Sequence, residues 1–314
     1  GRGGMSLPNT PEKWAINLSK IIKHFHEAHG LQRFPINVAS IAAEYSKQIF
    51  PNEPITMVEG MDLSQKFEGA LLPHPNGHGE WGIIYNKSIS SKGRINFTLA
   101  HELGHYLLHR QLSPKGMQCS GRDMLNWNSE HGRIEAQANT FASFLLMPLD
   151  DVREQVNGNS VDLDLMSHLA DRYDVSLTAA ILKWLDMTPK RAMIVIGKDG
   201  FIDWAWCSKS LLKSGIFYKA RQNLTALPDA SLAARGDLLI DNRTGVVHPK
   251  DIWVGNEEVR EMTTFSKQGQ MSISLLLYPD DAPGKWDKDL EEPEELDTYD
   301  QFTGADKQSA QLKR

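Results

Sequence analysis

The stretch "FTLAHELGHYLLH", residues 97–109, decides how the rest of the chain is interpreted. Its apolar residues recur at helical spacing and predict a helix over about residues 91–110. His101 and His105 are four positions apart, so both imidazoles lie on one face of that helix and can reach a single ion. Glu102 is rotated from His101 by about 100°, which lets it approach a water molecule beside the metal without ligating the ion. The alternative is an ordinary buried helix that happens to carry histidines.

A catalytic zinc site needs a third protein ligand and an open fourth position. The segment "RIEAQANTFASFLLMP", residues 133–148, predicts a second helix with Glu135 in its first turn. A carboxylate at the start of a mostly buried helix needs a partner, and a metal ion is one. Stabilisation of the helix dipole is the alternative for Glu135. Glu130 and His131, in the polar stretch before the helix, are rival ligands.

Asn139 is four positions after Glu135 and therefore shares its helix face. Its amide is suited to accept the N–H of a metal-bound histidine, or to hold Glu135 in place. Simple polar packing of the helix is the alternative interpretation.

The sequence does not decide two further parts of a catalytic zinc site. A donor is needed for the negative charge that develops during hydrolysis. Four residues are candidates: Tyr85, Tyr106, His109 and His131. The segment "GEWGIIYN", residues 79–86, is either an edge strand to which a peptide substrate could add or an interior strand.

The segments "RINFTLAHELGHYLLH", residues 94–109, and "IEAQANTFASFLLMP", residues 134–148, together resemble the signature segments of the ImmA/IrrE family of zinc metallopeptidases. The resemblance covers about residues 35–187. It implies one zinc ion per chain, bound by His101, His105 and Glu135 in a thermolysin-like arrangement. It also implies that Glu102 is the catalytic base.

The resemblance implies a cytoplasmic zinc endopeptidase that hydrolyses a peptide bond in a specific protein. For the family, the expected partner is a helix-turn-helix repressor encoded nearby, whose cleavage would relieve repression of stress-response or mobile-element genes. The alternative is a regulatory binding protein with a structural or vestigial zinc ion, which sequesters a transcription factor or senses a ligand. The oligomeric state is not predicted.

The fold class expected from these patterns is α+β, in four parts. Residues 5–155 are expected to form a zincin-like domain with a small antiparallel or mixed sheet and the HExxH helix. Residues 156–189 are expected to form a helix-turn-helix-like pair, and residues 190–280 a mixed α/β domain for which the family suggests a GAF-like sensor fold. Residues 281–314 are acidic and poor in aliphatic side chains, which predicts a disordered tail.

Local signals predict several elements around the motif helices. Thr10-Pro11 is a helix start and Gly30 a helix stop, and a second helix is expected over residues 38–47. The segments 67–73 and 80–86 flank a Gly- and Pro-rich turn and predict a hairpin. Residues 111–129 are expected to be a loop. Asp199-Gly200 predicts the turn of another hairpin.

Composition excludes some classes of protein. The chain has 314 residues, a net charge of −6 and two cysteines, Cys119 and Cys207. Two distant thiols in a chain of this length do not form a disulfide framework, and a reducing cytoplasm is expected. No apolar run approaches the roughly 18 residues that span a bilayer. The predicted helix after Ser176 carries a single cation, Lys183, so nucleic-acid binding is disfavoured.

Overall fold

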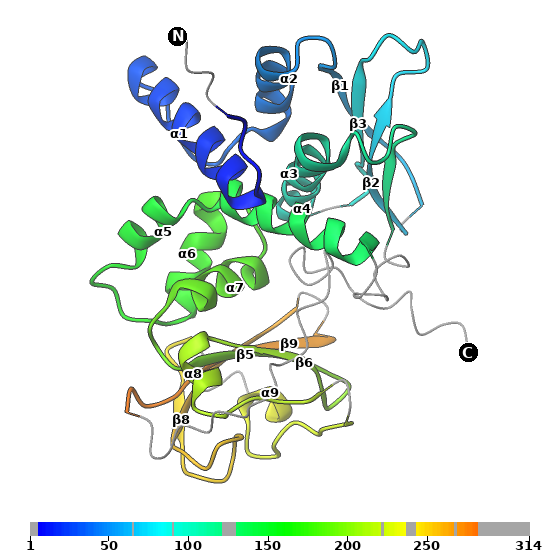
Figure 1. The fold of residues 1–314 in the computed structure, drawn as a ribbon. Helices are drawn as coiled ribbons and strands as arrows, with labels where there is room; N and C mark the ends of the chain where they lie inside the picture. Colours follow the sequence, from blue (N-terminus) through cyan, green and yellow to red (C-terminus); the bar gives the residue numbers. More distant parts are fainter. Residues whose placement is uncertain are drawn as a thin grey trace. The chain divides into compact units, whose positions relative to one another are not determined.

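The computed structural model describes residues 6–64, 66–89, 91–120, 130–220, 223–236, 243–266 and 269–281. Contacts divide the chain into two compact units (Figure 1). Of the described residues, those within 6–154 and 170–179 form the first unit, and those within 155–169 and 180–281 form the second. The predicted acidic tail lies outside the described residues, except for Asp281. The four-part domain division stays a prediction.

The structure is a mixture of helices and strands, as the α+β expectation requires. The helices are α1 Pro11–His29, α2 Val38–Ile49, α3 Lys92–His109, α4 Glu130–Leu146, α5 Leu149–Val156, α6 Leu163–Tyr173, α7 Leu177–Met187, α8 Lys209–Lys213 and α9 Leu232–Arg235. The strands are β1 Ile55–Met61, β2 Phe67–Pro73, β3 Trp81–Asn86, β4 Met117–Ser120, β5 Ala192–Lys198, β6 Phe201–Cys207, β7 Val246–His248, β8 Val259–Phe265 and β9 Met271–Leu277.

Capping residues set the ends of the long helices in the first unit. The Thr10 side chain accepts a hydrogen bond from the Lys13 backbone N–H, and Gly30 ends α1 with a φ of 63°. Ser91 caps α3 in the same way by accepting from the Arg94 N–H. These groups satisfy backbone donors and acceptors that a helix end leaves unpaired. The helix boundaries predicted from sequence are confirmed to within a few residues.

The sheet of the first unit has the strand order β1-β3-β2-β4. β1 pairs with β3 in parallel, whereas β2 pairs with β3 and with β4 in antiparallel fashion. The predicted hairpin of β2 and β3 is confirmed. The edge-strand interpretation of residues 79–86 is wrong, because β3 lies between β1 and β2. The predicted loop over residues 111–129 is also wrong in part, since β4 pairs with β2 there.

Helix α3 lies against this sheet and also against α4 (Figure 1). Phe97, Leu103 and Tyr106 of α3 are buried. Gly69 permits the close approach of β2, because a Cβ there would lie 2.6 Å from Thr98 Cγ2 and 3.6 Å from Glu102 Cγ. The central strand β2 is therefore seated directly over the part of α3 that begins the histidine motif.

The second unit contains a five-stranded antiparallel sheet with the order β6-β5-β9-β8-β7. Asp199 and Gly200, with φ of 52° and 81°, form the predicted turn between β5 and β6. Strand β8 had no clear sequence signal and was not anticipated. Cys207 donates to the Ile216 carbonyl, and burial raises the pKa of its thiol to about 12, which disfavours a reactive thiolate. The GAF-like assignment stays a prediction.

Two helices, α6 and α7, occupy the segment predicted to form a helical pair. Asp174, in the turn between them, has a φ of 52°. Such a conformation is uncommon for residues other than glycine, although Asp and Asn adopt it more readily than most. The helix-turn-helix character of the pair stays a prediction.

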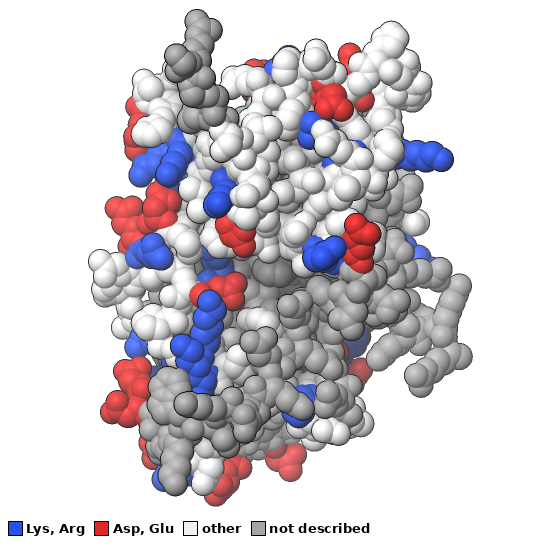
Figure 2. Space-filling view, viewed as in Figure 1, with Lys and Arg blue, Asp and Glu red and all other residues white. Residues whose placement is uncertain are grey.

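The charged side chains on the described surface are mixed in sign. On the face drawn in Figure 2, Lys and Arg side chains stand next to Asp and Glu side chains over the described residues. Among those residues, none of the helices combines the length and the apolar character that crossing a bilayer requires.

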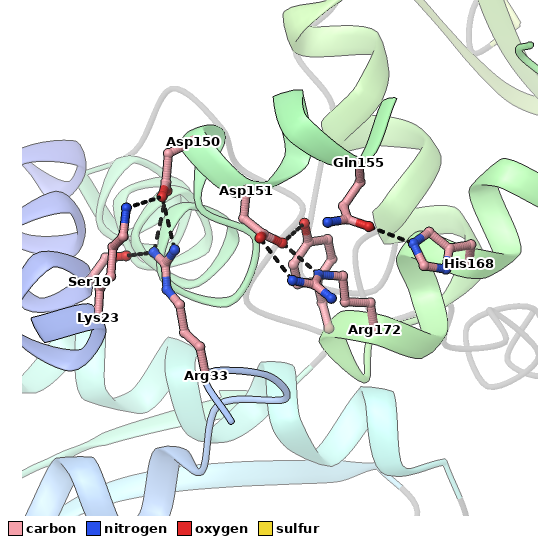
Figure 3. Close-up of polar contacts among 9 residues, drawn as sticks. Ser19, Lys23, Arg33, Asp150, Asp151, Gln155, His168 and Arg172 are labelled. Atoms are coloured by element: carbon pink, nitrogen blue, oxygen red, sulfur yellow. Dashed lines mark hydrogen bonds and ion pairs between the residues drawn. The ribbon is translucent and has the colours of Figure 1, made fainter. Parts of the chain in front are cut away.

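Two consecutive aspartates at the start of α5 anchor this helix differently (Figure 3). Asp151 is 5% exposed and accepts hydrogen bonds from Arg172 Nε at 2.6 Å and from the Tyr173 hydroxyl at 2.6 Å. The Asp150 side chain is 50% exposed and pairs with Arg33 and Lys23. The buried carboxylate therefore holds a network whose loss would leave buried polar groups unsatisfied.

We expect Asp151→Ala to lower the free energy of unfolding by about 2–3 kcal/mol, because a buried hydroxyl and a guanidinium lose a charged acceptor. Asp150→Ala is the matched control and should cost about 1 kcal/mol or less, since solvent screens an exposed pair. Urea denaturation of both variants measures the difference. Equal losses of stability would contradict this account of the network.

Candidate metal centre

Three side chains from two helices meet inside the first unit. His101 and His105 come from α3 and Glu135 comes from the first turns of α4, and all three are buried. The two Nε2 atoms are 3.0 Å apart. One Glu135 carboxylate oxygen lies 2.9 Å from His101 Nε2, and the other lies 3.1 Å from His105 Nε2.

These distances fit a single bound cation. Zinc binds imidazole nitrogen at about 2.0–2.1 Å, so ligand atoms of a tetrahedral site lie roughly 3.3 Å from one another. The two histidine nitrogens and the two Glu135 oxygens lie 2.9–3.1 Å apart in these contacts, and one ligand atom from each residue lies within 4.8 Å of the others. Two imidazoles and one carboxylate are also a donor set typical of catalytic zinc. The group found among the described residues has three members.

The predicted ligands are thus brought together, and the rival candidates are not part of the group. Neither Glu130 nor His131 belongs to the described cluster of potential ligands. Glu130 is the first residue of α4 and is exposed. Glu135 lies further along the helix, where α4 packs against α3, and this packing selects it.

Gly104 allows the two helices to approach each other at this point. A Cβ at Gly104 would lie 3.0 Å from Phe141 Cδ1, 3.2 Å from Phe141 Cβ and 3.3 Å from Ala138 Cα. A side chain here would push α4 away from α3. Glycine within the histidine motif therefore serves the distance between the helices, and hence the reach of Glu135.

Asn139 orients one of the two histidines. Its side-chain oxygen lies 2.8 Å from His101 Nδ1, and the contact is buried. An amide oxygen can only accept, so His101 carries its proton at Nδ1 and directs the lone pair of Nε2 towards the cluster. Of the two roles that the sequence left open for Asn139, the hydrogen bond to a histidine is the one observed.

The second histidine contacts residues that the sequence did not single out for this purpose. His105 Nδ1 lies 3.0 Å from His109 Nδ1, and His109 Nε2 lies 2.7 Å from Gln137 Oε1. His109 continues the four-residue spacing of His101 and His105, which is a signal available in the sequence. No comparable signal points to Gln137.

The hydrogen bonds of the site also show which candidates are free to stabilise the negative charge that develops during hydrolysis. Both ring nitrogens of His109 face other side chains, and the Tyr106 hydroxyl donates to the Glu53 carbonyl at 2.7 Å. These two residues are therefore engaged away from a substrate. Tyr85 stacks over Gly60 of β1, where a Cβ would lie 2.8 Å from its ring. His131 lies one turn before Glu135 on α4.

The electrostatics of the cluster favour positive charge among these residues. Burial opposes ionisation of Glu135, but His105 and His101 outweigh it and hold the pKa of this carboxyl far below its usual range. Burial lowers the pKa of His105 to about 4, against the opposing influence of Glu135. Burial acts on His101 in the same sense, yet Glu135 and Glu102 together leave its pKa raised. An ionised Glu135 beside a neutral His105 is the protonation state that metal ligation requires.

Glu102 lies in the middle of the site without belonging to the ligand group. It is fully buried on α3, directly after His101. A buried carboxylate next to a group of possible metal ligands is a candidate for proton exchange.

A comparison with known protein families identifies the same part of the chain. Residues 64–185 match the model of the Peptidase_M78 family, described as the IrrE N-terminal-like domain. The matched segment contains His101, Glu102, His105 and Glu135, and the match confirms the resemblance seen in the sequence. No curated protein matches the chain.

We expect Gly104→Ala to weaken zinc binding by about tenfold, because the added methyl group displaces the helix that carries Glu135. Titration against a chromogenic zinc chelator measures the affinity. Adding Phe141→Ala removes the closest of the three contacts and should recover part of the loss, since the two positions are coupled. Unchanged affinity in the single variant would show that the helices absorb the extra group without moving Glu135.

Proposed function

We propose that the chain is a zinc-dependent endopeptidase in which His101, His105 and Glu135 hold the metal and Glu102 is the general base. One observation carries this proposal: a buried group of three ligand atoms within 4.8 Å of one another, with a carboxylate beside it on the same helix. A structural zinc site commonly uses four protein ligands, whereas a catalytic site keeps a position open. The three-membered group among the described residues supports the catalytic alternative over a structural or vestigial zinc.

In this proposal the residues of the chain divide the chemistry of peptide hydrolysis. A bound zinc ion supplies Lewis-acid chemistry, polarising the scissile carbonyl and making water more acidic. Glu102 removes a proton from the attacking water as its oxygen bonds to the carbonyl carbon. Glu102 then delivers that proton to the leaving amine as the C–N bond breaks. Asn139 and the helix packing keep His101 and Glu135 in place throughout.

A peptide substrate would add to the sheet at the edge formed by β4. Within the described residues, β4 is the last strand on that side, and its Cys119 pairs with Gly69 of β2. Gly69 in turn approaches Glu102. An extended peptide added as a further strand outside β4 would gain main-chain hydrogen bonds on the same sheet that packs against α3. The proposed docking strand is therefore β4, and not β3, which the sequence analysis considered for this role.

The substrate that we propose is a helix-turn-helix repressor encoded near this gene and cleaved in the cytoplasm. This part of the proposal rests on the family resemblance. The discriminating experiment mixes purified protein, zinc and the purified repressor, and follows fragments by mass spectrometry. Fragments that vanish with a chelator and return with zinc would support it, whereas binding of the repressor without any fragment would favour the regulatory alternative.

We expect Glu102→Gln to bind about one zinc ion per chain, as the wild type does, while its cleavage rate falls by about 10²–10⁴-fold, the usual contribution of a general base. Metal content and initial rates measure the two effects separately. Glu27→Gln, at an exposed position on α1, is the matched control and should retain both properties. Full activity of Glu102→Gln would end the assignment of Glu102 as the base.

A further inference from the structure

The histidine motif continues beyond its two proposed ligands. His109 is the last residue of α3, is 2% exposed, and lies one turn after His105. The ring centroids of His105 and His109 are 5.2 Å apart. The contact is made on the Nδ1 side of His105, opposite the Nε2 atom that faces Glu135. His109 therefore stands behind a ligand and outside the metal group.

Gln137 determines which atoms donate and which accept in the contacts that join His105, His109 and Gln137. Gln137 presents its carbonyl oxygen, which can only accept, at 2.7 Å from His109 Nε2. His109 Nε2 therefore carries the proton, and a neutral imidazole then has an acceptor at Nδ1. That acceptor lies 3.0 Å from His105 Nδ1, which must be the donor.

The consequence for His105 is a defined tautomer. With the proton at Nδ1, its Nε2 atom directs a lone pair towards His101 Nε2 and Glu135, at 3.0 Å and 3.1 Å. A metal-binding imidazole needs this arrangement, and its other nitrogen usually donates to a fixed partner. Asn139 fixes the tautomer of His101 in the same way, by accepting the hydrogen bond from its Nδ1. Helix α4 therefore supplies Glu135 and, two and four positions later, the carbonyl groups that orient both histidines.

We propose that His109, held by Gln137, is a positioning residue that fixes His105 in the tautomer and orientation needed to bind the metal. The inference rests on the proposed metal site but concerns residues that are not ligands. It makes a prediction that simple packing does not make: what matters at position 109 is an acceptor facing His105, more than the volume of the side chain.

The test compares two substitutions at the same position. Asparagine places an amide oxygen close to the position of imidazole Nδ1, as Asn139 does for His101, whereas leucine fills the volume without an acceptor. We expect His109→Leu to weaken zinc binding by about 10–100-fold and His109→Asn to remain within several-fold of wild type. Packing alone predicts the reverse order, because leucine is apolar and of similar size while asparagine leaves a cavity.

A second pair of variants keeps the test decisive if His109→Leu does not fold. Gln137→Glu retains an acceptor for His109, and Gln137→Met removes it from a partly exposed position. We expect Gln137→Met to bind zinc more weakly than Gln137→Glu. Cobalt substitution supplies an independent readout, since the visible spectrum of the bound ion changes when the orientation of His105 is lost.

The outcomes separate this inference from the proposed function. A wild-type protein that binds no zinc would overturn both. A wild type that binds zinc, with His109→Leu and Gln137→Met binding it as tightly, would overturn the positioning role and leave the metal site intact. Stronger binding by His109→Leu than by His109→Asn would also overturn it, whereas the expected order in both pairs would support it.

Discussion

The close packing of α3 against α4 is the constraint on which the metal group depends. His101 and His105 are correctly spaced by the helix alone, but Glu135 reaches them only because Gly104 lets the second helix approach Phe141 and Ala138. Metal–ligand distances in a well-formed site lie within about 0.2 Å of their usual values. The distance between α3 and α4 must therefore be held as accurately as the positions of the candidate ligands.

Burial of the candidate ligands adds an electrostatic requirement to this geometric one. Glu102 and Glu135 are both buried, and carboxylates removed from water need compensating positive charge. The raised pKa of His101 reflects this need. A divalent cation would meet it more completely than a proton, because it interacts with every member of the group at once. Buried ionisable residues gathered in this way are typical of functional sites.

Helix α4 concentrates the supporting interactions in a short stretch. Glu135, Gln137 and Asn139 lie within five consecutive residues, and each contacts a histidine of α3. The two helices are thus joined by polar contacts at the site and by apolar contacts beside it. Rigid secondary structure on both sides holds a constellation of side chains more accurately than loops do.

Sequence by itself determined what depends on neighbouring residues. The caps at Thr10 and Gly30, the turn at Asp199-Gly200 and the four-residue spacing of the histidines are local features, since they arise within one or two helical turns or one hairpin. Only tertiary structure decided that β3 is interior, because its parallel partner β1 comes from a distant segment. It likewise decided that Glu135 and not Glu130 joins the histidines, and that Gln137 meets His109, since these depend on how one helix is placed against another.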